Sequence, residues 1–284
     1  MQRGQLHLYG TVRWKTNRFR NILRYGKAEI DGLPIIVGNA IPKSGSTLLY
    51  NILRGFVEIG PFINTKLSVI KPYTDGQPTE SGWIQKELLS LAPGDIRIGY
   101  FHAKPEYQAI LSEPQIAHYF IVRDPRDALV SSIFYAMDIN PNQFHHDFIK
   151  NLPDMEERLS FAIHGEAEGE YAMSDVGERY ARWTDWLDNK DVCLIRFEEL
   201  VSNREKQLGI MLDYLETRGF SPKLPRIQMI DNLKKQMAPE KSNTFRKGVS
   251  GEWRKFFSER NIEEFKNFTG DLLVKMGYEK NNDW

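Results

Sequence analysis

An apolar segment, residues 33–39, runs straight into a short loop that carries a lysine, a glycine and several hydroxyls, and a helical pattern follows from Ser46. Strand, loop and helix in this order predict an anion-binding turn. Gly45 lets backbone amides approach a tetrahedral oxyanion, and the start of the next helix points unpaired N–H groups at it. Lys43 adds a positive charge, and further donors come from the hydroxyls of Ser44, Ser46 and Thr47.

The order of residues in this loop differs from that of the common nucleotide-binding loop, Gly-x-x-x-x-Gly-Lys-Ser/Thr. In that loop the lysine follows a glycine and precedes the hydroxyl that holds magnesium. Counting from Gly38, the corresponding positions here are Lys43, Ser44 and Gly45. The segment therefore does not fit a kinase or NTPase loop, and by itself it is equally compatible with an ordinary strand-to-helix turn.

A second apolar run, residues 117–122, also ends in a charged turn that opens a helix. Pro125 suits the first helical turn, where its missing N–H costs nothing. Arg123 at the strand end can form a bidentate pair with a phosphate, and Ser131, two turns into the helix, can point back toward the same place. This segment predicts a second anion site.

Near the C-terminus, the run Arg246-Lys247-Gly248-Val249-Ser250-Gly251-Glu252-Trp253 combines two cations with two glycines. It can enclose a phosphate from another side, because the glycines keep backbone amides accessible. Taken alone, a solvated basic turn explains it better.

The three segments, in this order and spacing, resemble the cosubstrate-binding loops of sulfotransferases that use 3′-phosphoadenosine 5′-phosphosulfate (PAPS). The resemblance implies that residues Lys43 to Thr47 grip the 5′-phosphosulfate. It also implies that Arg123 and Ser131, eight positions apart, hold the 3′-phosphate, and that Arg246, Lys247 and Gly248 close around the cosubstrate.

Alternating strand and helix patterns predict an α/β fold with a central parallel sheet between two helical layers, which is also the P-loop-like sulfotransferase fold that the resemblance implies. The length of 284 residues suits one domain over 1–284, with a basic N-terminal arm or helix over 1–30. The predicted strands are 33–39, 95–101, 117–123 and 191–197. The predicted helices are 46–58, 125–136, 154–164, 176–189, 203–218 and 259–276.

His102 is the candidate general base. It follows the strand 95–101, as Lys43 and Arg123 follow theirs, and ligands of such sheets sit beyond the carboxyl ends of the strands. A neutral imidazole suits a base near pH 7, and His102 resembles the histidine of the family's Lys-Thr-His motif. With Lys43 stabilising the leaving oxygen, His102 would deprotonate an acceptor hydroxyl or amine, giving a sulfate ester or sulfamate and 3′,5′-ADP (PAP). The sequence holds no obvious metal-ligand cluster, so no metal is expected.

Three positions depart from the family pattern. Leu48 stands where many members carry a tryptophan that stacks on adenine, so adenine needs apolar contact there or another ring. Phe197, at the end of the strand 191–197, is a candidate for that ring and equally a core aromatic. Tyr100 replaces the lysine of Lys-Thr-His. The C-terminal dimer motif of the family lacks its Thr-Val here, and the oligomeric state is not inferred.

Equal numbers of acidic and basic residues, 38 each, argue against a dedicated nucleic-acid binder. No stretch is long and apolar enough to span a bilayer, and the single Cys193 suits a reducing compartment, so a cytoplasmic enzyme is expected. The first 28 residues hold seven Lys/Arg and no acid, with aromatic and aliphatic residues between them. They are compatible with a basic helix packed on the domain and with a helix at a membrane surface.

The acceptor is expected to be a small molecule. Acidic residues between Asp138 and Asp175 favour a polar or cationic acceptor if they face the pocket, and they are otherwise a solvated loop. The resemblance to the wider family, which includes enzymes that modify secondary metabolites, implies a saxitoxin-like alkaloid as one such acceptor. Two alternatives remain at this point: a small-molecule P-loop kinase, and a non-catalytic relative that binds PAPS or PAP.

Overall fold

The computed structural model describes residues 2–65, 67–74, 77–139, 145–166, 168, 172–238 and 249–284, with side chains from Val12 onward except at Thr74 and Gln77. The chain divides into two compact units. Unit 1 comprises residues 1–40, 45–122 and 189–243, and unit 2 comprises residues 41–44, 123–188 and 244–284. The expectation of one domain over the whole chain stays a prediction.

Unit 1 is built on a five-stranded sheet, in which the strands lie in the order β2-β5-β1-β6-β7 and every neighbouring pair is parallel. The strands are β1 (Ile35–Ala40), β2 (Ile63–Asn64), β5 (Asp95–Gly99), β6 (Ile116–Val122) and β7 (Val192–Arg196). Every residue of β1, β5 and β6 is buried, because helices cover both faces of a parallel sheet. Strands β1 and β6 are mostly apolar, whereas β5 also contains the buried charged residues Asp95 and Arg97. The predicted α/β fold with a central parallel sheet is confirmed.

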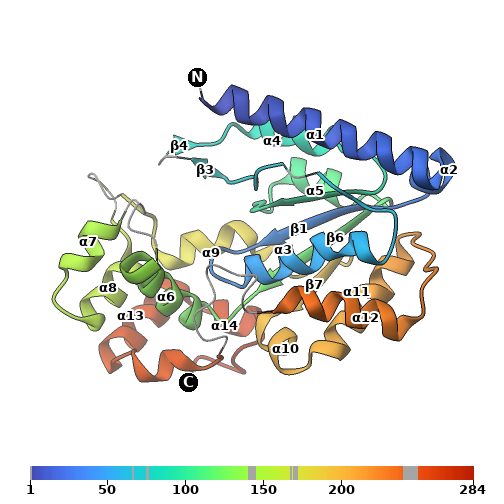
Figure 1. Ribbon diagram of the computed structural model, residues 1–284. Coiled ribbons are helices and arrows are strands. Elements are labelled where there is room, and N and C mark those ends of the chain that lie inside the picture. The colour runs from blue at the N-terminus through green and yellow to red at the C-terminus, as the bar shows by residue number, and fades with distance from the viewer. Residues whose placement is uncertain are drawn as a thin grey trace. The chain divides into compact units, whose positions relative to one another are not determined.

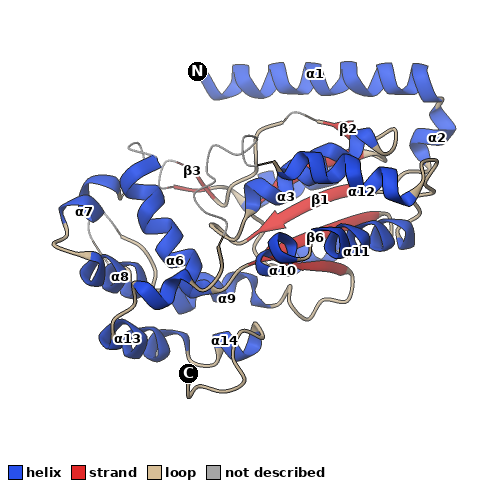
Figure 2. Cartoon of the chain, turned by 60° about the horizontal axis from the view of Figure 1, so that its bottom comes forward, coloured by secondary structure: helices blue, strands red, loops and turns tan. Residues whose placement is uncertain are grey.

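The helices of unit 1 flank this sheet, with α4 and α5 on one side and α3, α11 and α12 on the other (Figures 1 and 2). They are α1 (Gln2–Tyr25), α2 (Lys27–Asp31), α3 (Ser46–Arg54), α4 (Ser81–Leu89), α5 (Pro105–Leu111), α10 (Phe197–Ser202), α11 (Arg204–Thr217) and α12 (Arg226–Lys234). Short 3₁₀ turns η1 (Gly55–Glu58) and η3 (Lys235–Met237) follow α3 and α12, and β3 (Tyr73–Thr74) pairs antiparallel with β4 (Gln77–Pro78).

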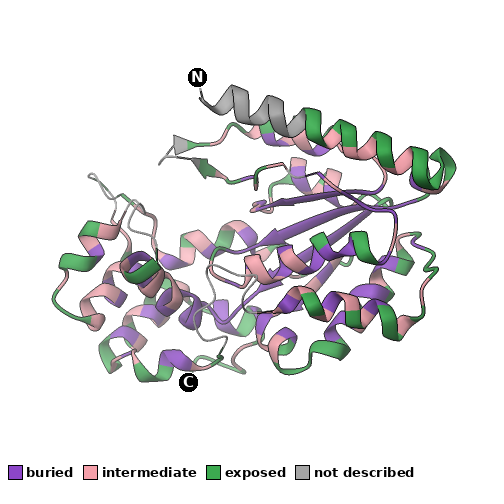
Figure 3. Ribbon diagram, viewed as in Figure 1, coloured by how far each residue is buried: buried purple, intermediate pink, exposed green. Residues whose placement is uncertain are grey.

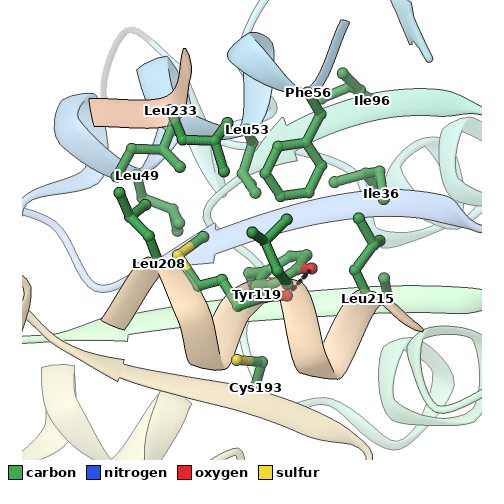
Figure 4. Packing of buried hydrophobic residues seen from close by; sticks show 14 of the residues in the cluster. Ile36, Leu49, Leu53, Phe56, Ile96, Tyr119, Cys193, Leu208, Leu215 and Leu233 are labelled. Atoms are coloured by element: carbon green, nitrogen blue, oxygen red, sulfur yellow. Dashed lines mark hydrogen bonds between the residues drawn. The ribbon is translucent and has the colours of Figure 1, made fainter. Parts of the chain in front are cut away.

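The hydrophobic core of unit 1 lies between the sheet and the helices α3, α11 and α12 (Figures 3 and 4). The rings of Phe56 and Tyr119 meet edge to face, with centroids 5.8 Å apart. The buried Tyr119 hydroxyl donates to the carbonyl of Met211 at 2.9 Å, so this polar atom does not weaken the core. Cys193 is buried in the same cluster, and burial raises its pKa to about 12.

Unit 2 contains the remaining helices. They are α6 (Pro125–Phe134), a π-helical turn η2 (Tyr135–Ile139), α7 (His146–Asn151), α8 (Met155–His164), α9 (Val176–Thr184), the 3₁₀ turn η5 (Glu252–Lys255), α13 (Glu259–Thr269) and α14 (Leu272–Lys275). Helix α8 packs against α6, α9 and α13. Apolar side chains from these helices, including Leu159, Ile163, Trp183 and Phe265, are buried.

Several predicted bounds were wrong, each for a local reason. The predicted helix 259–276 is two helices, because Gly270 takes a positive φ of 53° and ends α13. The predicted helix 46–58 becomes 3₁₀ at Gly55, and 125–136 becomes π-helical at Tyr135. The predicted helix 176–189 ends at Thr184. Short elements such as β2 and α5 carry too little periodicity to be read from the sequence.

His118 on β6 is fully buried, and burial, reinforced by the nearby Arg218 charge, lowers its pKa to about 3. The unfolded chain binds a proton below the ordinary pKa of 6.5, whereas the folded chain does not until about pH 3. Stability should therefore fall as the pH drops through this window, by about 2 kcal/mol at roughly pH 5. A His118→Leu variant should lose less stability than wild type between about pH 7 and pH 5 in urea titrations; an equal loss would contradict this.

None of the helices in the described part of the chain is long and apolar enough to cross a lipid bilayer.

Candidate active site

Unit 2 contains the first half of the glycine-containing loop, where Lys43 and Ser44 lie. Lys43 has a φ of 67°, a left-handed conformation that is costly for a residue with a Cβ and is found more often at functional sites. The amide of Ser44 donates to the carbonyl of Ile41 at 3.1 Å and closes the turn. The Ser44 hydroxyl is buried and has no hydrogen-bond partner among the described residues. A buried hydroxyl of this kind is costly, so the site suits a bound polar group.

The Lys43 ammonium is partly desolvated and lies near another positive charge, that of Arg123. Its Nζ is 3.5 Å from the centroid of the Tyr135 ring, which stands on the π-helical turn η2. Burial, and secondly the charge of Arg123, lowers its pKa to about 8. No carboxylate in the described ranges forms an ion pair with it. Two cations whose charges repel each other mark a place that favours a multiply charged anion.

Unit 1 contains the second half of the loop, where Gly45 precedes α3 with a φ of 91°. A Cβ at this position would lie 2.5 Å from Cδ2 of Phe197, so packing as well as backbone conformation requires glycine. Ser46 opens α3, and its hydroxyl is 3.0 Å from that of Tyr100. Tyr100, which stands in place of the family's lysine, thus contacts the loop.

The remaining predicted residues of this half lie on α3 and α10. Thr47 and Leu48 follow Ser46 in the first turn of α3, both half-buried, and Leu48 packs against the core. Phe197 does not end the strand as predicted, because β7 stops at Arg196 and Phe197 begins α10. It belongs to the hydrophobic core and supports the loop at Gly45.

In unit 2, Arg123 directly follows β6 and is almost fully buried. Its Nη2 donates to the carbonyl of Val249 at 3.0 Å and lies 3.9 Å from Oδ2 of Asp127. Ser131 lies half-buried on the same helix, α6, that begins after this arginine. The guanidinium is therefore tied to the chain just beyond the motif Arg246-Lys247-Gly248, whose three residues lie outside the described part of the structure.

Asp127 links Arg123 to the segment that follows the motif Arg246-Lys247-Gly248, and it was not identified from the sequence. Its carboxylate accepts hydrogen bonds from the backbone N–H groups of Gly251, at 2.7 Å, and Trp253, at 2.9 Å. Burial raises its pKa, although these two bonds and the Arg123 charge oppose the shift. Asp127 is a positioning residue, because it fixes both Arg123 and the segment after the basic motif.

A second buried arginine, Arg126, stabilises the start of α6 in unit 2. Arg126 pairs with Asp124 at 2.7 Å and with Glu279 at 2.7 Å. Its guanidinium carbon lies 4.0 Å from the ring centroid of Trp253 and 4.4 Å from that of Trp284. These contacts tie the start of α6 to the C-terminal residues of unit 2.

An Asp127→Ala variant should lose both backbone hydrogen bonds and the nearby negative charge. Leaving one buried and one partly buried N–H group unpaired should lower the free energy of unfolding by about 2–4 kcal/mol. Affinity for PAP should fall more than about tenfold, because Arg123 and the chain after Gly248 lose their common anchor. Urea unfolding and calorimetry measure the two effects. Wild-type affinity in a destabilised variant would contradict the positioning role.

His102 lies in unit 1, three residues after the end of β5. The buried Asn39 of β1 fixes the residue before it: its Oδ1 accepts from the Phe101 N–H at 2.8 Å and its Nδ2 donates to the Phe101 carbonyl at 3.0 Å. Tyr73 lies beside the imidazole, with ring centroids 6.3 Å apart. A polar residue inside the apolar run 35–40 was the signal for this support, and sequence reasoning did not use it.

The sequence matches the family model described as the sulfotransferase domain, over residues 35–277. The chain belongs to the sulfotransferase family. Mouse sulfotransferase SULT7A1 complexed with PAP has a similar structure, with a TM-score of 0.56 and 17% identity over 90% of this chain and 92% of that one. Retinol dehydratase in complex with androsterone and the inactive cofactor PAP is also similar, with a TM-score of 0.54 and 15% identity over 86% and 83%. No sequence among the curated proteins matches this chain.

The family match confirms that this enzyme is a sulfotransferase and favours sulfuryl transfer over the kinase alternative. The structural likenesses confirm the sulfotransferase fold. The individual roles of the site residues remain predictions.

Proposed function

We propose that this sulfotransferase moves the sulfuryl group of PAPS to a hydroxyl or amine of a small polar or cationic acceptor, in the cytoplasm and without a metal ion. The observation that carries the proposal is the half-buried Lys43, whose Nζ lies over the Tyr135 ring and whose pKa is lowered to about 8 by desolvation and by Arg123. An anion bound between Lys43 and Arg123 would offset the repulsion between their positive charges. PAP in both similar solved structures supports the choice of cosubstrate.

The residues present fit this cosubstrate. The unpartnered Ser44 hydroxyl, the left-handed Gly45 and the amides at the start of α3 suit the 5′-phosphosulfate. Arg123 with Ser131, and Arg246, Lys247 and Gly248, would hold the 3′-phosphate. Leu48 and Phe197 would contact adenine through apolar surface.

The transfer breaks the bond between sulfur and the bridging oxygen and forms one from sulfur to the acceptor oxygen or nitrogen. PAPS supplies an activated sulfuryl group on a phosphate leaving group. Lys43 would stabilise the negative charge that remains on that phosphate oxygen, and His102 would take the acceptor's proton. Asn39 keeps the backbone next to His102 in place, so the imidazole needs little reorganisation.

A cationic acceptor, for which a saxitoxin-like alkaloid is an example, is supported by Glu166 in unit 2. Its backbone pairs with Met173 through two 2.8 Å hydrogen bonds. Its Oε2 is buried and has no hydrogen-bond partner among the residues described. A buried carboxylate oxygen of this kind favours a bound cation or donor.

A Glu166→Gln variant should raise KM for a guanidinium-bearing alcohol by about 10–100-fold, because a charge-assisted contact is lost. KM for a neutral phenol should stay the same. Glu168→Gln is the matched control, since Glu168 is exposed. Equal effects of the two variants, or equal turnover of both acceptors by wild type, would remove the basis for a cationic acceptor.

The reaction is tested by incubating the enzyme with radiolabelled PAPS and a panel of acceptors or a metabolite extract. The proposal predicts that label moves to an acceptor and that PAP forms in equal amount. Tight PAP binding without transfer to any acceptor would instead support the non-catalytic relative. Magnesium-dependent phosphate transfer from ATP would support the kinase.

A further inference from the structure

The helix α1 of unit 1 lies outside the family domain, because the match to the family model begins at residue 35. Polar contacts hold its inner face on the rest of the unit. Trp14 donates from Nε1 to Oδ1 of Asp95 at 2.9 Å, and Arg18 donates to the carbonyl of Pro93 at 2.9 Å. One turn further, the Asn21 amide donates to the backbone of Pro61 and Phe62. The orientation of α1 on unit 1 is thereby fixed.

This orientation exposes an apolar stripe on the outer face of α1. Val12, Phe19 and Leu23 follow each other at spacings of seven and four residues, which places them on one side of a helix. Their exposures are 57%, 63% and 70%. Thr16 lies on the same side, and its hydroxyl donates to the Val12 carbonyl at 2.9 Å. The stripe therefore presents no polar side-chain group that lacks a partner.

Cations border this stripe. Arg13, Arg20 and Arg24 repeat the spacings of seven and four residues, one position further along, and Lys15 lies on the other border. All four are exposed, and none forms an ion pair with an acidic side chain of the described ranges. The whole chain carries no net charge, whereas its first 28 residues contain seven cations and no acid. The outer face of α1 is thus both apolar and strongly basic.

We propose that the outer face of α1 docks this enzyme on an anionic phospholipid surface, with the helix lying in the plane of the interface. The stripe Val12, Phe19 and Leu23 would enter the acyl boundary, and the flanking arginines would reach lipid phosphates. A nucleic acid would use the cations but would leave the apolar stripe in water. The mixture of exposed apolar and cationic residues on one face matches a charged bilayer.

The test is flotation of the full-length enzyme with vesicles of phosphatidylcholine containing about a third phosphatidylserine, and with pure phosphatidylcholine. We expect binding to the anionic vesicles, weaker binding in about 0.5 M salt, and little binding to the neutral ones. Arg13→Ala, Arg20→Ala and Arg24→Ala together should weaken binding by about 100-fold, at roughly fivefold per cation. Phe19→Ser with Leu23→Ser should weaken it more than about tenfold.

Matched controls come from other helices of unit 1. Ile227 and Leu89 are also exposed, at 76% and 66%, so Ile227→Ser with Leu89→Ser tests loss of apolar surface elsewhere. The exposed cations Arg204, Lys206 and Lys235, changed together to alanine, test loss of charge elsewhere. Both controls should bind like wild type.

Absence of wild-type binding to anionic vesicles would overturn the proposal, as would unchanged binding by Phe19→Ser with Leu23→Ser. Self-association that this double variant abolishes, without vesicle binding, would assign the face to a second copy of the chain. These results do not depend on sulfuryl transfer, so they are separate from the test of the enzyme's activity.

Discussion

A Lys43→Met variant is expected to lose sulfuryl transfer and yet to be more stable than wild type without ligand. Loss of the charge beside the leaving oxygen should lower kcat/KM by about a thousandfold or more. Lowering the pKa of Lys43 from 10.5 to about 8 corresponds to about 3 kcal/mol of destabilisation at neutral pH. The cation–π contact with Tyr135 stabilises wild type by about 1 kcal/mol and is lost in the variant. The variant is therefore expected to be more stable than wild type by about 2 kcal/mol.

The pH dependence of this gain provides its internal control. Because the pKa in the folded state lies below that in the unfolded state, the penalty is complete below about pH 8 and disappears as the pH rises toward 10.5. Urea titrations at several pH values measure it. An inactive variant that is less stable than wild type at neutral pH would show that Lys43 serves the fold. A fully active Lys43→Met variant would show that Lys43 takes no part in the reaction.

A His102→Ala variant is expected to lose about 10²–10⁴-fold in kcat while it binds PAP like wild type. The imidazole takes the acceptor's proton in the proposed reaction and does not hold the cosubstrate. Activity assays with saturating PAPS, together with calorimetry for PAP, separate the two properties. The loss should be smaller for an acceptor whose nucleophile is already ionised at the assay pH.

His164→Ala is the matched control, because the His164 side chain is 43% exposed on α8. It should retain full activity. Full activity of His102→Ala would overturn the assignment of the base. Loss of PAP binding in the same variant would assign His102 to the cosubstrate site or to the stability of the loop after β5.

Strands β1, β5, β6 and β7 and the turns after β1 and β6 could be predicted, because buried parallel strands are rich in apolar residues and anion-binding turns need particular residue types. The run 35–40 and the turn at Lys43 are examples. Asp127 and Asn39 could not be assigned in this way. Each acts through backbone groups that are distant in sequence, at Gly251 and Phe101, and such hydrogen bonds leave no local pattern.

The ends of several helices could not be predicted from the sequence either. The break at Gly270 and the π-helical turn at Tyr135 depend on backbone conformations that tertiary packing selects. The lowered pKa of Lys43 depends on its burial in the folded state and on the charge of Arg123, 80 positions away in the sequence. The sequence identified the lysine as a cation but not its desolvation.

Calorimetric titration with 3′,5′-ADP and with 5′-AMP most directly tests whether the enzyme encloses both charged ends of its cosubstrate. The wild-type enzyme should bind 3′,5′-ADP at least about 100-fold more tightly, because a bidentate, charge-assisted contact to the 3′-phosphate is available only to that ligand. Arg123→Met should remove most of this difference. Equal affinity of wild type for the two nucleotides would contradict the account.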